Sequence, residues 1–197
     1  MMRYHGAASS GERVARGWRD EAMSIKIRGE TSRDALVIEA VTASAFLHAA
    51  HTSHAEQCIV NALRRAGKLV VSLVAEVDGS VVGHVAISPV SISDGTAGWF
   101  GLGPISVLPQ HQRRGIGSQL MREGLRLLRE RGASGCVVLG EPEYYRRFGF
   151  RADPDLVLPG VPSEYFQAVA FDSSRPRGNV TYDEAFSSPT AGSMDFR

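Results

Sequence analysis

The chain has 197 residues, a length that suits one compact domain with a real core and is short for two. Hydrophobic residues make up 43% and charged residues 22%, so most of the chain should fold as an ordinary globular protein. The formal net charge of +1 gives no strong electrostatic attraction to nucleic acid or to acidic membranes, so neither partner is expected.

Cysteine usage and the two ends of the chain bound its location and organisation. Cys58 and Cys136 lie far apart and make no disulfide framework, so we expect a reducing, cytoplasmic environment. No stretch approaches the ~20 apolar residues of a membrane span. Residues 1–22 lack the apolar run of a secretory signal, and we expect a flexible leader there, a single domain over 23–186 and a loose tail over 187–197.

The first part of the domain predicts two helices followed by a β-hairpin. The pairs Thr31/Asp34 and Ser53/Glu56 have the spacing of capping boxes and predict helices over residues 32–46 and 54–66. β-Branched runs over 69–77 and 81–88 flank Asp78-Gly79, which is a strong signal for a two-residue hairpin turn.

The second part predicts a strand–helix–strand crossover. A strand over 99–108 precedes a helical apolar period that runs from Gly115 to Gly132, and a short buried strand follows at Cys136–Leu139. Such a crossover implies parallel neighbouring strands. Pro142 opens a further short helix, and two late strands are expected over 165–171 and 179–182. The predicted fold is therefore mixed α/β: a mostly antiparallel sheet with one parallel pair and helices on both faces.

The turn before the long helix is suited to an anion. Gly115 and Gly117 allow the backbone to approach a ligand closely, and a helix start offers unpaired N–H groups and the positive end of the helix dipole. The backbone amides of Arg113–Ser118 therefore predict a phosphate site, with Arg113 and Arg114 adding charge at its rim.

Two common phosphate motifs do not match this turn. A nucleotide-binding P-loop needs Gly-Lys-Ser/Thr, which the chain lacks. A dinucleotide site needs a third glycine, but Leu120 stands at that position. From these residues alone, a helix begun by glycine with no ligand remains open, as does a weaker nucleotide-binding alternative.

The fuller pattern, Val107-x-Pro109 followed by Gln112-x-x-Gly115-x-Gly117 and Leu120, resembles the acetyl-CoA signature of the GNAT superfamily of N-acetyltransferases. The resemblance implies acetyl-CoA as cosubstrate, its pantetheine arm lying like an extra strand along a bulged strand that splays from its parallel neighbour. Gly103-Pro104 fits such a bulge, because proline removes a ladder donor. By the same resemblance the CoA-binding residues are Ile105, Ser106, Val107, Gln112, Arg113, Arg114, Gly115, Ile116, Gly117, Ser118 and Tyr145.

A second motif, Glu141-Pro-Glu-Tyr-Tyr145-Arg-Arg-Phe-Gly-Phe150, resembles the family's Tyr-x-x-x-Gly-Phe segment. Together with Gly-Leu-Gly-Pro-Ile-Ser-Val it is similar to a branch of small prokaryotic predicted acetyltransferases. The register implies that Tyr145 is the general acid that protonates the departing CoA thiolate. The implied reaction is direct attack of a primary amine, on a small molecule or a peptide, in a ternary complex. A homodimer, common among relatives, is a further expectation, and a CoA- or acyl-CoA-binding sensor without catalysis is the alternative.

The general base is the least determined part of the predicted site. Glu141 is the first candidate because it stands where the splayed strand ends, although a helix cap beside Pro142 explains it as well. Glu76 and His84 are the next choices. His48, His51 and His54 repeat every three residues, but Thr52-Ser53 predicts a helix start among them, so no metal site is expected.

Overall fold

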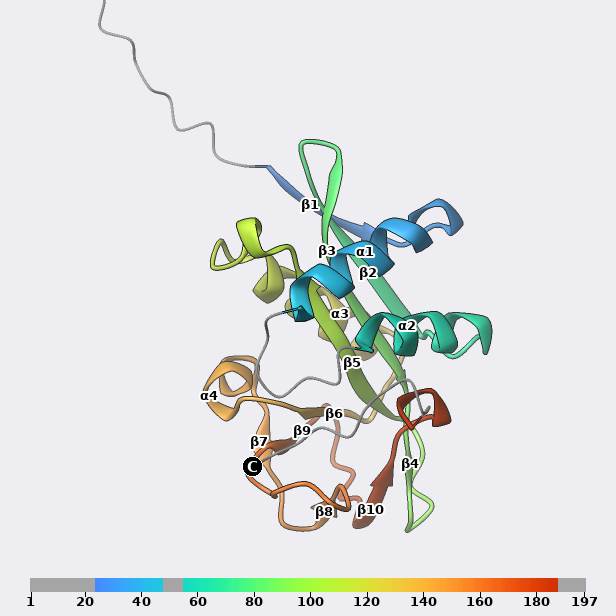
Figure 1. Ribbon diagram of the computed structural model, residues 1–197. Helices are drawn as coiled ribbons and strands as arrows, with labels where there is room; N and C mark the ends of the chain where they lie inside the picture. Colours follow the sequence, from blue (N-terminus) through green and yellow to red (C-terminus); the bar gives the residue numbers. More distant parts are fainter. Residues whose placement is uncertain (1–23, 48–54, 188–197) are drawn as a thin grey trace, which may run out of the picture.

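The computed structural model describes residues 24–47 and 55–187 (Figure 1). The predicted leader, the histidines at 48, 51 and 54, and the predicted tail apart from Ser187 lie outside the described residues. The strands are β1 (Ile25–Gly29), β2 (Val71–Val77), β3 (Ser80–Pro89), β4 (Ser91–Ile92), β5 (Trp99–Val107), β6 (Gly135–Leu139), β7 (Arg151–Ala152), β8 (Leu156–Val157), β9 (Phe166–Ala170) and β10 (Gly178–Thr181). The α-helices are α1 (Ala35–Phe46), α2 (Glu56–Arg65), α3 (Ile116–Glu130) and α4 (Pro142–Tyr145), with 3₁₀ turns η1 (Ser32–Asp34), η2 (Pro109–His111), η3 (Arg146–Phe148) and η4 (Glu184–Phe186).

The main sheet has the strand order β1-β2-β3-β5-β6-β9-β7. β5 and β6 are its parallel pair, joined through α3, and the other neighbours are antiparallel. A small second sheet has the order β4-β10-β8. The predicted mixed α/β class, with its antiparallel majority and parallel crossover, is confirmed.

Local signals placed most elements within a few residues of their observed bounds. Asp78 and Gly79 adopt φ angles of 51° and 77°, the left-handed conformations of a type I′ hairpin turn, between β2 and β3. β1 was not predicted from the sequence; its five residues pair with β2 at the edge of the sheet. Within the described residues, α2 begins after Ala55 rather than after a Ser53 cap, and Ser53 itself is not described.

Helices cover both faces of the sheet, as predicted. α3 packs on one face, where its buried residues join the largest apolar cluster, which includes Val85, Ile87, Leu120, Leu125 and Phe150. α1 and α2 cover the opposite face, the near side in Figure 1, through a cluster that contains Ile38 and Val60. Among the described helices none is long and apolar enough to cross a membrane.

The two parallel strands separate after a short shared ladder. Only Trp99, Phe100 and Gly101 of β5 pair with β6. The last of these pairs joins Gly101 to Val137. Beyond Gly101, β5 continues beside β3, and β6 continues beside β9. We call the point of separation, at Gly101 and Val137, the branch.

A bulge in β5 lies just beyond the branch. Ile105 pairs with Val85 and Leu102 with Ile87, so Gly103 and Pro104 together oppose the single residue Ala86. An extra residue on one strand bends that strand and increases its twist. The bulge predicted at Gly103-Pro104 is confirmed.

An ion-pair network fixes β1 and the start of the first helical segment to the sheet. Arg28 donates to Asp34 at 2.7 and 3.0 Å and to Glu76 of β2 at 2.6 and 2.8 Å. Asp34 also accepts from the Thr31 N–H at 2.7 Å, completing the predicted capping box. The hydrogen bond from Arg28 is the main cause that lowers the pKa of Asp34 well below its ordinary value.

Asp34 should therefore make the fold sensitive to acid. Because its pKa is lower in the folded state, its contribution is present above the unfolded value of about 3.9 and is lost as the pH falls below it. We expect Asp34→Asn to cost about 1–2 kcal/mol at pH 7 and to flatten the loss of stability below pH ~4, measured by urea unfolding across pH. The exposed carboxylate of Glu164 serves as control, and Glu164→Gln should change little. An Asp34→Asn variant as acid-sensitive as the parent would contradict this account.

Candidate active site

The loop between β5 and α3 has a fixed left-handed shape. The Gln112 side chain donates from Nε2 to the Val107 carbonyl at 2.9 Å, which ties the loop back to the end of β5. Arg113 has a φ of 59° and Gly115, the residue before α3, has a φ of 81°. A residue other than glycine at position 115 would be strained by that angle, although the space around it is open. Gly115 is thus required by the backbone turn itself.

The first turn of α3 presents backbone donors at its open end. The helical ladder begins with the bond from the Gln119 N–H to the Gly115 carbonyl, at 3.0 Å, so the N–H groups of Ile116, Gly117 and Ser118 precede it. The Ile116 side chain is 1% exposed and anchors this turn in the core. These donors and the helix dipole together favour an anion in front of the turn.

Gly117 has a second reason to be glycine. A Cβ at Gly117 would lie 3.0 Å from the Tyr144 hydroxyl, so α4 packs its tyrosine directly against the start of α3. From the sequence, Gly117 was predicted only to let a ligand approach the backbone, and Tyr144 was not predicted to belong to the site. The only sequence signal for this role of Tyr144 was its place in a tandem of tyrosines shortly before Phe148. In the structure its ring packs against those of both Tyr145 and Phe148.

The backbone of β5 offers hydrogen-bonding groups on the side of β6. Leu108 donates its N–H to Val82 of β3 at 2.9 Å, and successive residues of a strand point their N–H and C=O groups in opposite directions. The backbone groups of Ile105 and Val107 therefore face away from β3, toward the space beyond the branch. Those of Ser106 face β3, and its hydroxyl lies 3.2 Å from that of Thr42 in α1.

The end of β6 is held in place beside this edge. The buried side chain of Gln167 on β9 donates from Nε2 to the Gly140 carbonyl at 3.1 Å. Glu141 follows, exposed, and its carbonyl accepts the N–H groups of Tyr144 and Tyr145 at the start of α4. Although Glu141 occupies the N-cap position, its side chain makes no capping hydrogen bond within the described structure.

Tyr145 lies inside, close to the end of β6. It is 9% exposed and packs edge-on against both Tyr144 and Phe150, at ring distances of 5.0 and 5.9 Å. A Cβ at Gly140 would lie 2.5 Å from its ring, so the ring packs directly on the backbone of Gly140, the residue that follows β6. Burial raises the pKa of Tyr145 above its ordinary value, and the hydroxyl is therefore protonated at neutral pH.

The other two candidate bases are committed to structural networks. Glu76 belongs to the network of Arg28 described above. His84 is completely buried on β3 and shares a hydrogen bond of 2.8 Å with Ser72, which donates to Glu30 at 2.5 Å. Burial lowers the pKa of His84, so its ring is neutral at pH 7. Among the described residues no cluster of three or more His, Cys, Asp or Glu side chains is arranged for a metal ion.

The segment after β10 also reaches the branch, and no motif pointed to it. Tyr182 lies over Gly101, and Phe186 lies near Gly103. The sequence shows only a short late strand and two aromatic residues here, and their position depends on how the second sheet meets the first.

The chain is similar to known proteins over most of its length. The family described as "Acetyltransferase (GNAT) domain" matches residues 69–152. The uncharacterised N-acetyltransferase YhbS of Escherichia coli K12 is 40% identical over 156 residues, which cover 76% of this chain and 93% of that protein.

Solved structures agree with this relationship. A GNAT family acetyltransferase from Brucella melitensis in complex with acetyl-CoA is 49% identical, with a TM-score of 0.74 over 83% of this chain and 99% of that one. YhbS from Escherichia coli in complex with CoA has 34% identity and a TM-score of 0.77 over 86% of this chain and 96% of that one. The chain therefore belongs to the GNAT family of N-acetyltransferases.

Proposed function

We propose that this protein transfers an acetyl group from acetyl-CoA to a primary amine by direct attack within a ternary complex. The observation that carries the proposal is the branch, where β5 leaves β6 after Gly101, so that in the described structure no strand pairs with the edge of β5 that faces the space beyond the branch. A relative 49% identical was solved with acetyl-CoA, which supports the choice of cosubstrate.

The cosubstrate would use two kinds of backbone group. Its diphosphate would lie on the N–H groups of Arg113–Ser118, with the exposed Arg113 and Arg114 beside it. Its pantetheine arm has two amides, which would pair with the groups of Ile105 and Val107 as another strand does. The thioester would then end near the branch, because the gap between β5 and β6 closes at Gly101 and Val137.

The reaction balances with one proton removed and one supplied. The amine nitrogen attacks the thioester carbonyl carbon, the C–S bond breaks, and an amide and the CoA thiol result. A backbone N–H of β5 at Ile105 or Val107 would stabilise the developing oxyanion. Tyr145 would donate its proton to the sulfur, and Glu141 would accept the proton from the amine, directly or through water.

Burial of Tyr145 affects both its own acidity and the basicity of the thiolate that it would protonate. A raised pKa makes the phenol a weaker acid, but a thiolate formed in the same apolar surroundings is destabilised by the same loss of solvent. The two pKa values therefore stay comparable, so the proton can pass between them, and the tyrosine is still protonated when the thiolate forms.

Substitution of Gly115 tests the diphosphate site, and the same substitution at Gly132, at the other end of α3, is the matched control. Gly115 and Gly132 flank the two ends of α3, both have positive φ angles, and both have open space around them. We expect Gly115→Glu to weaken CoA binding at least about tenfold, since a carboxylate would stand at the anion site, while Gly132→Glu leaves it unchanged. Calorimetric titration with CoA measures this. Equal affinity of both variants and the parent would remove the site from the loop.

Tyr145→Phe tests the acid. A general acid contributes about 10²–10⁴-fold, so we expect kcat to fall by about 10²-fold or more with CoA affinity within about twofold, measured as thiol release from acetyl-CoA on an amine library. Tyr165→Phe, a hydroxyl removed elsewhere, controls for the substitution. Because the pKa of Tyr145 is raised, the parent should show no loss of rate from this group near pH 10.

Glu141→Gln tests the base in the same assay. We expect a lower kcat and the disappearance of the acidic limb of the pH–rate profile, because a glutamine cannot take up the amine's proton. The exposed Glu143, two residues later in the first turn of α4, provides the matched control, Glu143→Gln. An unchanged profile in Glu141→Gln would assign the base elsewhere. Binding of CoA without thiol release on any amine would instead favour a protein that only senses CoA.

A further inference from the structure

A tyrosine from the C-terminal segment closes one face of the branch. A Cβ at Gly101 would overlap the Cε1 atom of the Tyr182 ring, so the ring lies directly on the last residue that β5 shares with β6. The Tyr182 hydroxyl lies 3.5 Å from the carbonyl oxygen of Val137, the partner of Gly101 across the ladder. Val90 approaches the same point, 2.7 Å from where that Cβ would stand.

This wall is braced by a second aromatic residue. The rings of Tyr182 and Phe186 lie 4.8 Å apart at an angle of 56°, and Phe186 comes within 3.5 Å of a Cβ placed on Gly103, in the bulge. Phe186, four residues later in the same segment, thus holds the Tyr182 ring against Gly101. Movement of the Tyr182 ring away from Gly101 would therefore break its contact with the Phe186 ring.

The opposite wall of the branch is formed by buried residues. Cys136 and Leu102 belong to the core cluster on the α3 side, as does Tyr145. Burial raises the pKa of Cys136 to about 12 and those of Tyr145 and Tyr182 above their ordinary values, so all three groups are neutral. An acyl group at the branch would lie between two uncharged walls.

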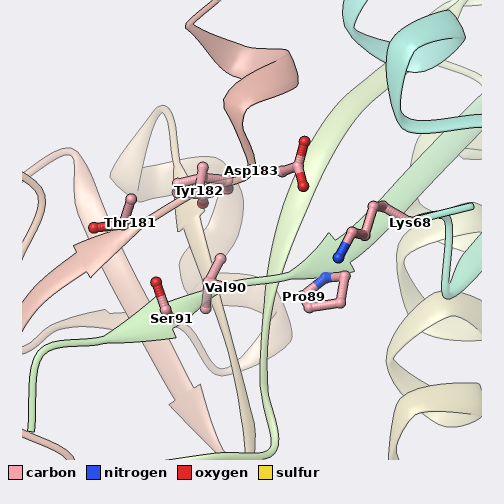
Figure 2. A pocket seen from close by; sticks show the side chains of 7 residues that line it. All are labelled: Lys68, Pro89, Val90, Ser91, Thr181, Tyr182 and Asp183. Carbon is pink, nitrogen blue, oxygen red and sulfur yellow. The ribbon is translucent and has the colours of Figure 1, made fainter. Parts of the chain in front are cut away.

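Free space begins on the far side of Tyr182. A pocket of about 230 Å³ is lined by Lys68, Pro89, Val90, Ser91, Thr181, Tyr182 and Asp183 (Figure 2). Tyr182 and Val90, the two side chains that reach Gly101, also line this pocket. They therefore form the partition between the branch and a space that would accommodate a longer chain.

We infer that Tyr182 limits the acyl group of the cosubstrate to about the size of acetyl. The inference rests on the proposed function, because it assumes that the thioester ends at the branch. The bulge and the unpaired edge of β5 direct an arm toward Gly101, and there the Tyr182 ring leaves no room for added methylene groups. Loss of the ring joins the branch to the pocket beyond.

Binding of acyl-CoA thioesters tests this without knowledge of the acceptor. Dissociation constants for CoA, acetyl-CoA and butyryl-CoA are measured by calorimetry on the parent, Tyr182→Ala and Tyr182→Phe. We expect the parent to bind butyryl-CoA at least about tenfold more weakly than acetyl-CoA, and Tyr182→Ala to bring the two within about threefold. Tyr182→Phe keeps the ring and should keep the ratio of the parent.

Val90→Ala is a second test of the partition, which remains informative if Tyr182→Ala fails to fold. It trims the same partition from β3's side without disturbing the C-terminal segment, and it should lower the ratio by about threefold, the worth of roughly one methylene group. A parent that binds both thioesters alike, or folded variants that keep the parent's ratio, would overturn the inference. Failure of the parent to bind CoA itself would instead overturn the proposed function, so the two failures are distinguishable.

Discussion

The bulge at Gly103 and Pro104 is the constraint on which the site depends. Proline cannot donate a ladder hydrogen bond, and the extra residue opposite Ala86 turns β5 away from its parallel neighbour. Had the two strands stayed paired, the backbone groups of Ile105 and Val107 would be consumed within the sheet. Because they separate, a backbone edge is left that a ligand with amide groups can complete. The proposed binding site is therefore an interrupted sheet, in which the start of α3 would receive the charged end of the ligand.

Aromatic rings packed on glycines build the surroundings of this interruption. Trp99 covers Gly135 across the β5–β6 ladder, Tyr145 covers Gly140 after β6, and the Tyr144 hydroxyl fills the space beside Gly117. Each glycine lets a ring approach the backbone directly, and each ring returns the apolar contact that glycine lacks. These three glycines thus serve the packing of aromatic rings. Gly115 in the first motif and Gly149 in the second are explained instead by their positive φ angles of 81° and 95°.

Patterns in the chain predicted those parts of the fold that depend on neighbouring residues. The change from strand to helix period at Gly115, the Asp78-Gly79 turn and the Thr31–Asp34 capping box all act within a few residues, and the structure has each of them. Contacts between distant segments were beyond reach. β1 has too few residues to show a period, and it is an element only because β2 pairs with it. Tyr182 reaches the branch through the second sheet, which no local pattern specifies.

The separation of charged and neutral groups bears on how the proposed reaction would handle its protons. Charged side chains are paired at the edge of the sheet, as with Arg28 and Asp34, whereas the branch is lined by the neutral Tyr145, Tyr182 and Cys136. An ammonium ion would be destabilised between such walls, so the amine must lose its proton before it attacks. The acceptor of that proton should stand in water, where it can discharge it after each turnover, and Glu141 is exposed. The donor to sulfur should stand inside, because a tyrosinate left in an apolar site regains its proton readily. In the proposed mechanism, a buried acid and an exposed base both follow from the uncharged branch.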